Sequence, residues 1–119
     1  MAGNLSTAVI DALRGAPAKG MLVDLFRLPP DLGERRHLRT IETDAGGTSA
    51  APLIEGEALI PAVYELLFHI GRYFKAERMP LEDAPFLDVI PVRFSIGDTS
   101  RPCRLILLVS PWTYTVYRS

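Results

Sequence analysis

The sequence predicts an all-β sandwich, because short apolar runs recur along its whole length with turn residues between them. Within a run, apolar and polar residues alternate. In residues 21–27, Met21, Val23 and Leu25 share one strand face, and Asp24 lies on the other. The segments expected to form strands are residues 5–11, 21–28, 38–43, 62–69, 89–96, 104–109 and 112–117.

The segments between these runs carry turn chemistry, as in residues 14–17, 29–33, 44–47 and 97–98, which are rich in Gly, Pro and Asp. One segment has the period of a helix instead. Its apolar residues Ile70, Tyr73 and Phe74 alternate with polar ones in the helical spacing, which predicts a short helix over 70–77. Pro91 lies inside an apolar run and removes one backbone donor, so its strand should be an edge strand or contain a bulge.

Composition limits the function classes. A chain of 119 residues and 13.1 kDa, 48% of it hydrophobic, is expected to form one globular domain over residues 1–119. Lys and Arg total 13 against 14 acidic residues, with no basic block, which argues against nucleic-acid binding. The apolar runs are too short to span a bilayer, so we expect no membrane insertion. A single cysteine and an N-terminus without a signal-peptide pattern indicate a cytoplasmic protein.

Several blocks of the sequence carry a family resemblance. They are Leu5-Ser6-Thr7-x-Val9-Ile10-Asp11, Arg14-Gly15-x-Pro17-Ala18, the segment 64–74, the segment 85–94, and Leu107-Leu108-Val109-Ser110-Pro111-Trp112 with the tail 117–119. In this order they resemble the transthyretin-like proteins, and more specifically the bacterial 5-hydroxyisourate hydrolases. The resemblance implies a sandwich of two four-stranded sheets with one short helix. It also implies a homotetramer, a dimer of dimers around a central channel that contains the site.

The chain departs from the hydrolase pattern at the polar positions of that site. Ala8 stands where the resemblance implies a histidine, Thr48 where it implies an arginine, and Arg104 where it implies a second histidine. The tail is one glycine short. An arginine cannot act as a general base at neutral pH, because its guanidinium stays protonated. These departures predict that the hydrolase's catalytic residues are replaced.

Strand parity then predicts which side chains line the channel. Arg104 is expected to bind or polarise an anionic oxygen, with Tyr117 or Thr115 supplying a proton or a hydrogen bond. The residues expected to bind the ligand are Ser6, Ala8, Thr48, Ile106, Leu108, Arg118 and Ser119. A simpler possibility is that Arg104 pairs with the C-terminal carboxylate of Ser119 across the interface between subunits.

The remaining reactive side chains are expected to be structural. Parity places Cys103 in the core, where a thiol is generally inert. His69 should lie on the outer face of its strand and His37 on a solvated edge. Two histidines and one cysteine without clustered spacing predict no metal site, and we expect no cofactor.

These observations predict a repurposed member of the family. It would bind, and perform chemistry on, a small ring-containing anion in the channel, outside urate breakdown. Three alternatives stay open: a 5-hydroxyisourate hydrolase with an altered site, a non-catalytic small-molecule carrier, and a purely structural partner. Whether the protein is an enzyme at all is left open, since a fold alone does not decide function.

Overall fold

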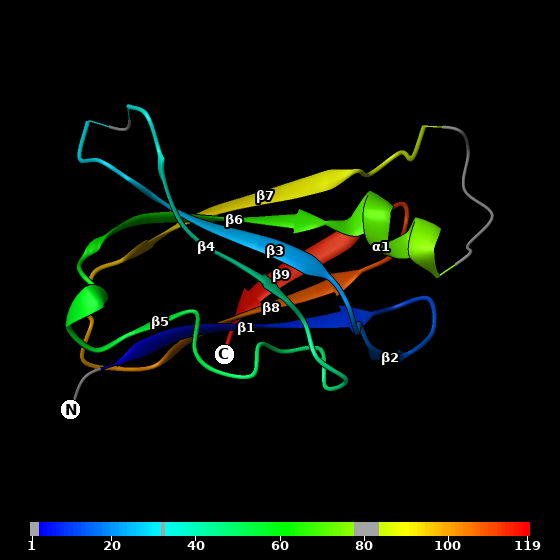
Figure 1. Cartoon of the computed structure of the whole chain (residues 1–119), viewed down its shortest axis with the longest axis horizontal. Coiled ribbons are helices and arrows are strands. Elements are labelled where there is room, and N and C mark those ends of the chain that lie inside the picture. Colours follow the sequence, from blue (N-terminus) through cyan, green and yellow to red (C-terminus); the bar gives the residue numbers. More distant parts are fainter. Residues whose placement is uncertain (1–2, 32, 78–83) are drawn as a thin grey trace.

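Two sheets packed face to face form the molecule, as Figure 1 shows for the computed structural model, which describes residues 3–31, 33–77 and 84–119. The elements are β1 (Asn4–Asp11), β2 (Ala16–Pro17), β3 (Leu22–Leu28), β4 (Arg36–Glu42), β5 (Ile54–Glu55), the 3-10 turn η1 (Gly56–Ala58), β6 (Ala62–His69), α1 (Ile70–Ala76), β7 (Val89–Ile96), β8 (Cys103–Val109) and β9 (Tyr114–Arg118). Leu32 of the predicted turn 29–33 lies outside the described residues.

The predicted all-β sandwich with one short helix is confirmed. One sheet has four strands in the order β4-β3-β6-β7. The other has the order β2-β1-β8-β9 and gains a fifth strand, because β5 also pairs with β1. The two-residue strands β2 and β5 were not predicted, since a pair of residues is too short to show alternation.

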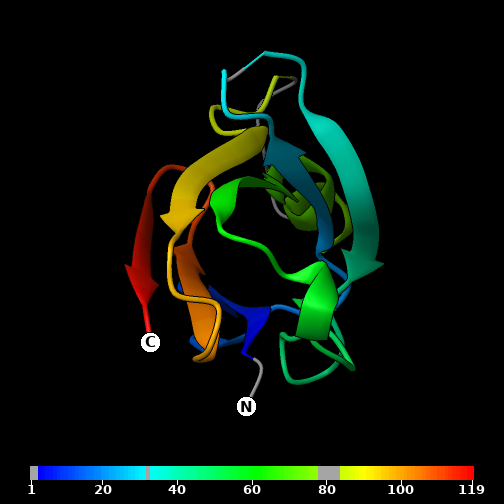
Figure 2. The ribbon, with the colours of Figure 1, turned by 90° about the vertical axis from the view of Figure 1, so that its left-hand side faces the viewer.

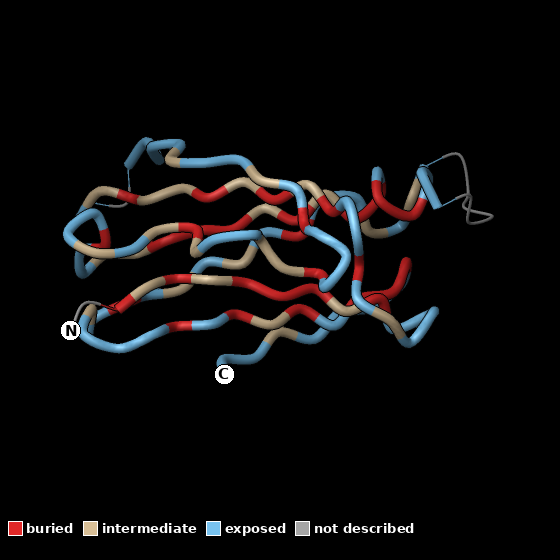
Figure 3. The backbone as a smooth tube through the Cα atoms, turned by 60° about the horizontal axis from the view of Figure 1, so that its bottom comes forward, coloured by how far each residue is buried: buried red, intermediate tan, exposed pale blue. Residues whose placement is uncertain are grey.

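The pairing of β1 with β8 is parallel, and every other strand pair is antiparallel. Along β8 the side chains alternate between the two sides of the sheet. Cys103, Leu105 and Leu107 are buried in the core, whereas Arg104 and Leu108 are exposed on the outer face. Figure 3 shows this alternation of buried and exposed residues along the strands. The predicted core position of Cys103 is therefore confirmed.

The core fills the space between the inner faces of the sheets, which Figure 2 shows end-on. Its largest fully buried side chains include Tyr64, Phe68, Phe74, Met21 and Leu66. In the same view β7 and β9, the edge strands of the two sheets, lie on one side of the sandwich. Pro91 lies in β7, which is an edge strand of its sheet. This confirms the prediction made from the missing backbone donor of Pro91. No helix among the described residues has the length and apolarity needed to cross a membrane.

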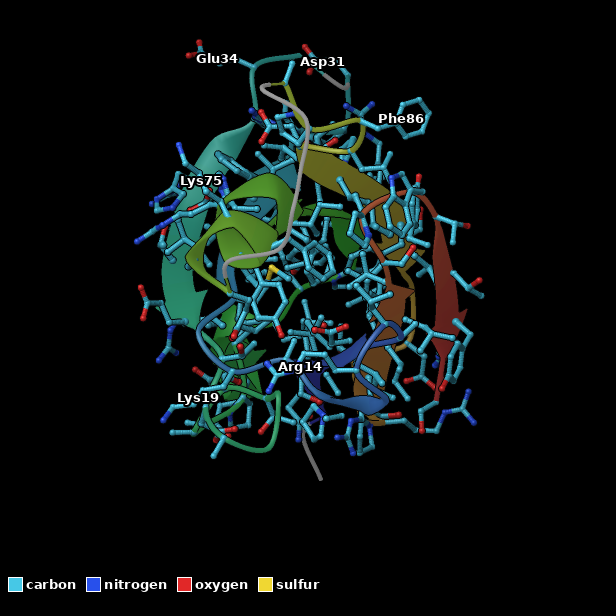
Figure 4. All side chains as sticks on the ribbon, turned by 90° about the vertical axis from the view of Figure 1, so that its right-hand side faces the viewer. Arg14, Lys19, Asp31, Glu34, Lys75 and Phe86 are labelled. Atoms are coloured by element: carbon cyan, nitrogen blue, oxygen red, sulfur yellow. The ribbon has the colours of Figure 1, made fainter. Side chains whose placement is uncertain are left out.

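A buried carboxylate ties α1 to the end of β1. Asp11, which is 1% exposed, accepts hydrogen bonds from the Tyr73 hydroxyl at 2.9 Å and from the backbone N–H groups of Leu13 and Arg14 at 3.0 and 3.1 Å. Burial and the bond to Asp11 raise the pKa of Tyr73 to about 12, so the phenol remains a donor at all ordinary pH values. The Arg14 guanidinium, labelled in Figure 4 beneath α1, adds an ion pair with Glu77 at 3.1 Å.

Tyr73→Phe should lower the free energy of unfolding by about 1.5–3 kcal/mol, because it removes a hydrogen bond to a buried charged group. Tyr114→Phe is the matched control. That tyrosine is 43% exposed, and its hydroxyl has no hydrogen bond among the described residues, so we expect a change below about 0.5 kcal/mol. Urea unfolding at neutral pH measures both variants. Equal destabilisation of the two would contradict this role for the Tyr73 hydroxyl.

Candidate functional site

The outer face of the five-stranded sheet brings together residues that are far apart in the sequence. The register places Ala8 opposite Ile106, Ile106 opposite Tyr117, and Thr48 in an isolated bridge with Ala8. Thr48, Ala8, Ile106 and Tyr117 therefore form one row across the sheet. A second row contains Leu108, which is paired with Thr115.

A hollow of about 250 Å³ lies at one end of this face. Ser6 and Arg104, which are directly opposite in the β1–β8 register, form part of its wall, and Thr48 forms another part. Its remaining lining residues are Asn4, Thr7, Ser49, Ala50, Ala51 and Pro52. Most of the named side chains carry hydroxyl or amide groups, and the only charge among them is the Arg104 cation. The hollow can therefore hold a small polar anion.

The loop that carries Thr48 is held by the Asp44 carboxylate. Asp44 Oδ1 accepts hydrogen bonds from the backbone N–H groups of Gly46 at 2.9 Å and Thr48 at 3.1 Å. These bonds, above all the one from Thr48, lower the pKa of Asp44. Gly47 then contacts β1, where its carbonyl accepts from the Val9 N–H at 2.9 Å. The loop is thus fixed beside the strand that carries Ser6.

Arg104 is exposed, and its guanidinium forms no ion pair within residues 3–31, 33–77 and 84–119. A backbone hydrogen bond holds the C-terminal residue beside Arg104, because the Ser119 N–H donates to the Arg104 carbonyl at 2.8 Å. Within one chain this contact is therefore a backbone bond, and the described residues show no ion pair between the Arg104 guanidinium and the Ser119 carboxylate. Their pairing across an interface between subunits stays a prediction. Arg118 pairs with buried Leu105 and so points away from the face that carries Tyr117.

Six of the lining residues are absent from the sequence-based set, and Asn4 and Ser49 are two of them. Asn4 could have been found by the same parity that selected Ser6, because it is two residues earlier on β1 and Leu5 between them is fully buried. Ser49 could not, because the path of an irregular loop carries no periodic signal.

Both histidines lie away from the hollow, on the outer face of the four-stranded sheet. They converge on Asp24, with His69 Nε2 at 2.7 Å from one carboxylate oxygen and His37 Nε2 at 3.6 Å from the other. Partial burial acts to raise the pKa of Asp24, but hydrogen bonds from Thr40 and His69 hold it below its usual value. The sequence predicted the outer face of its strand for His69 and a solvated edge for His37, but not their approach to the same carboxylate. Even so, no group of three metal-ligating side chains capable of holding an ion occurs in the part of the chain that the structure describes.

Comparison with known proteins decides the family. The model of the HIUase/Transthyretin family matches residues 5–119. The chain belongs to this family. It is 41% identical over 116 residues to a 5-hydroxyisourate hydrolase of Ralstonia nicotianae, covering 98% of this chain and 97% of that one. It is 42% identical over 117 residues to 5-hydroxyisourate hydrolase 2 of Rhizobium meliloti, covering 98% and 95%.

Solved structures of related proteins agree with this fold. A crystal structure of (S)-allantoin synthase superposes with a TM-score of 0.93 at 32% identity, covering 99% of this chain. The chain spans 44% of the length of that protein. Sea bream transthyretin in complex with thyroxine superposes with a TM-score of 0.86 at 27% identity, and the match covers 98% of this chain and 94% of the sea bream chain.

These relatives overturn one prediction. The predicted function outside urate breakdown is wrong. Relatives named 5-hydroxyisourate hydrolase match this chain over nearly its full length, with about two identical residues in five. The prediction gave the departures expected at the site more weight than the similarity of the rest of the chain. A hydrolase with an altered site, which the sequence left open as an alternative, fits these relatives better.

Gly47→Ala tests how the loop positions Thr48. Gly47 has a φ of 76°, and an added Cβ would lie 2.4 Å from the Val9 carbonyl oxygen. We expect the variant to lose more than about 1 kcal/mol of stability, from the left-handed backbone and the forced separation of loop and strand. Gly46→Ala is the control, because its Cβ would meet only the Asp44 carboxylate, at 3.4 Å. Thermal unfolding that shows equal losses would contradict the proposed loop contact.

Proposed function

We propose that this chain is a 5-hydroxyisourate hydrolase with an altered site. The observation that carries the proposal is the identity of 41–42% with hydrolases of that name over 98% of the chain. The similarity to (S)-allantoin synthase supports a role in urate breakdown. The hollow that contains Arg104 supports a site on the outer face of the five-stranded sheet. Residues 1–119 would act as one domain.

Arg104 would stabilise the charge that develops during ring opening. Water adds to the lactam carbonyl carbon, and the electron pair of the carbonyl bond moves to the oxygen. The carbon–nitrogen bond then breaks, the ring nitrogen takes a proton, and a carboxylate remains. A guanidinium donates hydrogen bonds to such an oxyanion without losing its own proton. Because Arg104 has no ion pair among the described residues, its donors are free for this task.

Water activation would proceed without an imidazole. His37 and His69 contact Asp24 on the other sheet, so neither can reach the hollow of the same chain. The Ser6 hydroxyl lines the hollow and can orient the attacking water, and the Thr48 hydroxyl, which already donates to Asp44, can still accept a hydrogen bond from it. The water loses its proton to the solvent before it attacks, so the attacking species is hydroxide. A positioned general base typically contributes about 10²–10⁴-fold, so this site should work more slowly than one with a histidine. Thr115 and Tyr117 would border the substrate along the same face.

Assembly into a homotetramer around a channel is part of the proposal. The outer face of the five-stranded sheet leaves Leu108 and Tyr117 at 37% and 48% exposure, an apolar surface that favours a partner. The edge strands β7 and β9 lie on one side of the sandwich, where a second copy could extend both sheets (Figure 2). Twofold axes would then place copies of this face opposite one another.

Light scattering tests the assembly. At micromolar concentration we expect the mass of four chains of 13.1 kDa. Leu108→Glu should reduce that mass, because it places a charge in the apolar face. A monomer for the unaltered chain would contradict the channel and the site within it.

Turnover of freshly generated 5-hydroxyisourate tests the activity. The unaltered protein should accelerate its decay, and Arg104→Met should lower kcat/KM by about 10²–10³-fold, as loss of a donor to the oxyanion typically does. Arg36→Met is the matched control: this arginine is exposed on β4 of the other sheet, and the variant should retain full activity. Binding of the compound without any acceleration would favour a carrier and contradict the proposal. Equal activity of the two variants would contradict the role of Arg104.

A further inference from the structure

Some polar side chains of the hollow already form hydrogen bonds within the protein, and others do not. The hydroxyls of Thr48 and Ser49 hydrogen-bond within their own loop, to a carboxylate and to a backbone carbonyl. The side chains of Asn4 and Ser6 make no hydrogen bond within the described residues. Arg104 makes no ion pair there. An amide, a hydroxyl and a guanidinium are therefore available to a ligand on one wall.

Strand geometry fixes how these three groups are spaced. Leu5 is fully buried, so its neighbours Asn4 and Ser6 both project from the outer face of β1. Residues two apart on a strand are about 7 Å apart. Ser6 is directly opposite Arg104 on β8. The amide and the guanidinium are thus offset along the sheet by roughly the span of a two-ring heterocycle.

The chemistry of Asn4 matches one kind of ligand edge. A carboxamide presents a carbonyl acceptor beside an NH₂ donor. A cyclic ureide presents the complementary pair, a ring N–H beside a carbonyl oxygen. Asn forms the same two-bond pairing with the edges of nucleobases. A guanidinium offers only donors, so it suits an anionic oxygen at the other end of the ligand.

We propose that Asn4 is a specificity-determining residue of the site, which recognises the N–H/C=O edge of a cyclic ureide whose anionic oxygen binds Arg104. This inference rests on the proposed function and deepens it. Arg104 would supply affinity for anions in general. Asn4 would select among flat anions those that carry a ureide.

Calorimetric titration with two probes separates these contributions. Urate is a flat anion with ureide edges, and the reaction does not open its rings under the assay conditions. Benzoate is a flat anion without a ureide. Asn4→Leu, which keeps the approximate shape of the side chain and removes both hydrogen bonds, should weaken urate binding about ten- to thirtyfold and leave benzoate binding within twofold. Arg104→Met should weaken binding of both probes. Arg36→Met, at an exposed position of β4 on the other sheet, is the control and should change neither.

Kinetics with 5-hydroxyisourate provides the second readout. Asn4→Leu should raise KM by a similar factor and leave kcat nearly unchanged, because the contact is made equally in the ground and transition states. Unchanged urate affinity in Asn4→Leu, or an equal loss for urate and benzoate, would overturn the role of Asn4 and leave the proposed hydrolase intact. If the unaltered protein neither binds urate nor accelerates the decay of 5-hydroxyisourate, the proposed function fails and the inference fails with it.

Discussion

The parallel pairing of β1 with β8 is the constraint on which the rest of the molecule depends. It fixes which side chains of both strands point into the core and which point outward, so that buried Leu5 and Leu107 support exposed Ser6 and Arg104. A slip of one residue would exchange the two faces and bury the guanidinium without a partner, at a cost of several kcal/mol. The outer face is therefore defined by the same apolar contacts that hold the sandwich together.

The sequence predicted those parts of the fold that have a period. Alternation predicted the seven longer strands within a few residues of their bounds, and the helical spacing of Ile70, Tyr73 and Phe74 predicted α1. The short strands β2 and β5 were not predicted, because their pairing depends on where β1 lies and not on their own residues. For the same reason the convergence of two distant histidines on Asp24 could not be predicted from local pattern.

The candidate site was predictable where it lies on strands. Parity selected Ser6 and Arg104, which the structure brings to one hollow, and the same rule would have selected Asn4. The position of Thr48 next to Ala8 requires a loop held by Asp44 and by a left-handed glycine, and such a loop is built from contacts distant in sequence. The function was predicted poorly, because departures expected at a few site positions were given more weight than a similarity that extends along nearly the whole chain.

We propose that ring opening relies on the charge of Arg104 and on hydroxide from the solvent, without an imidazole base. The dependence of kcat/KM on pH tests this most directly, between about pH 5.5 and 8.5, a range that brackets the ordinary histidine pKa of about 6.5. We expect kcat/KM to rise steadily through this range, about tenfold per pH unit, because the attacking species is hydroxide. An inflection near pH 6.5 followed by a plateau would show that an imidazole accepts the proton, and would contradict catalysis without a general base.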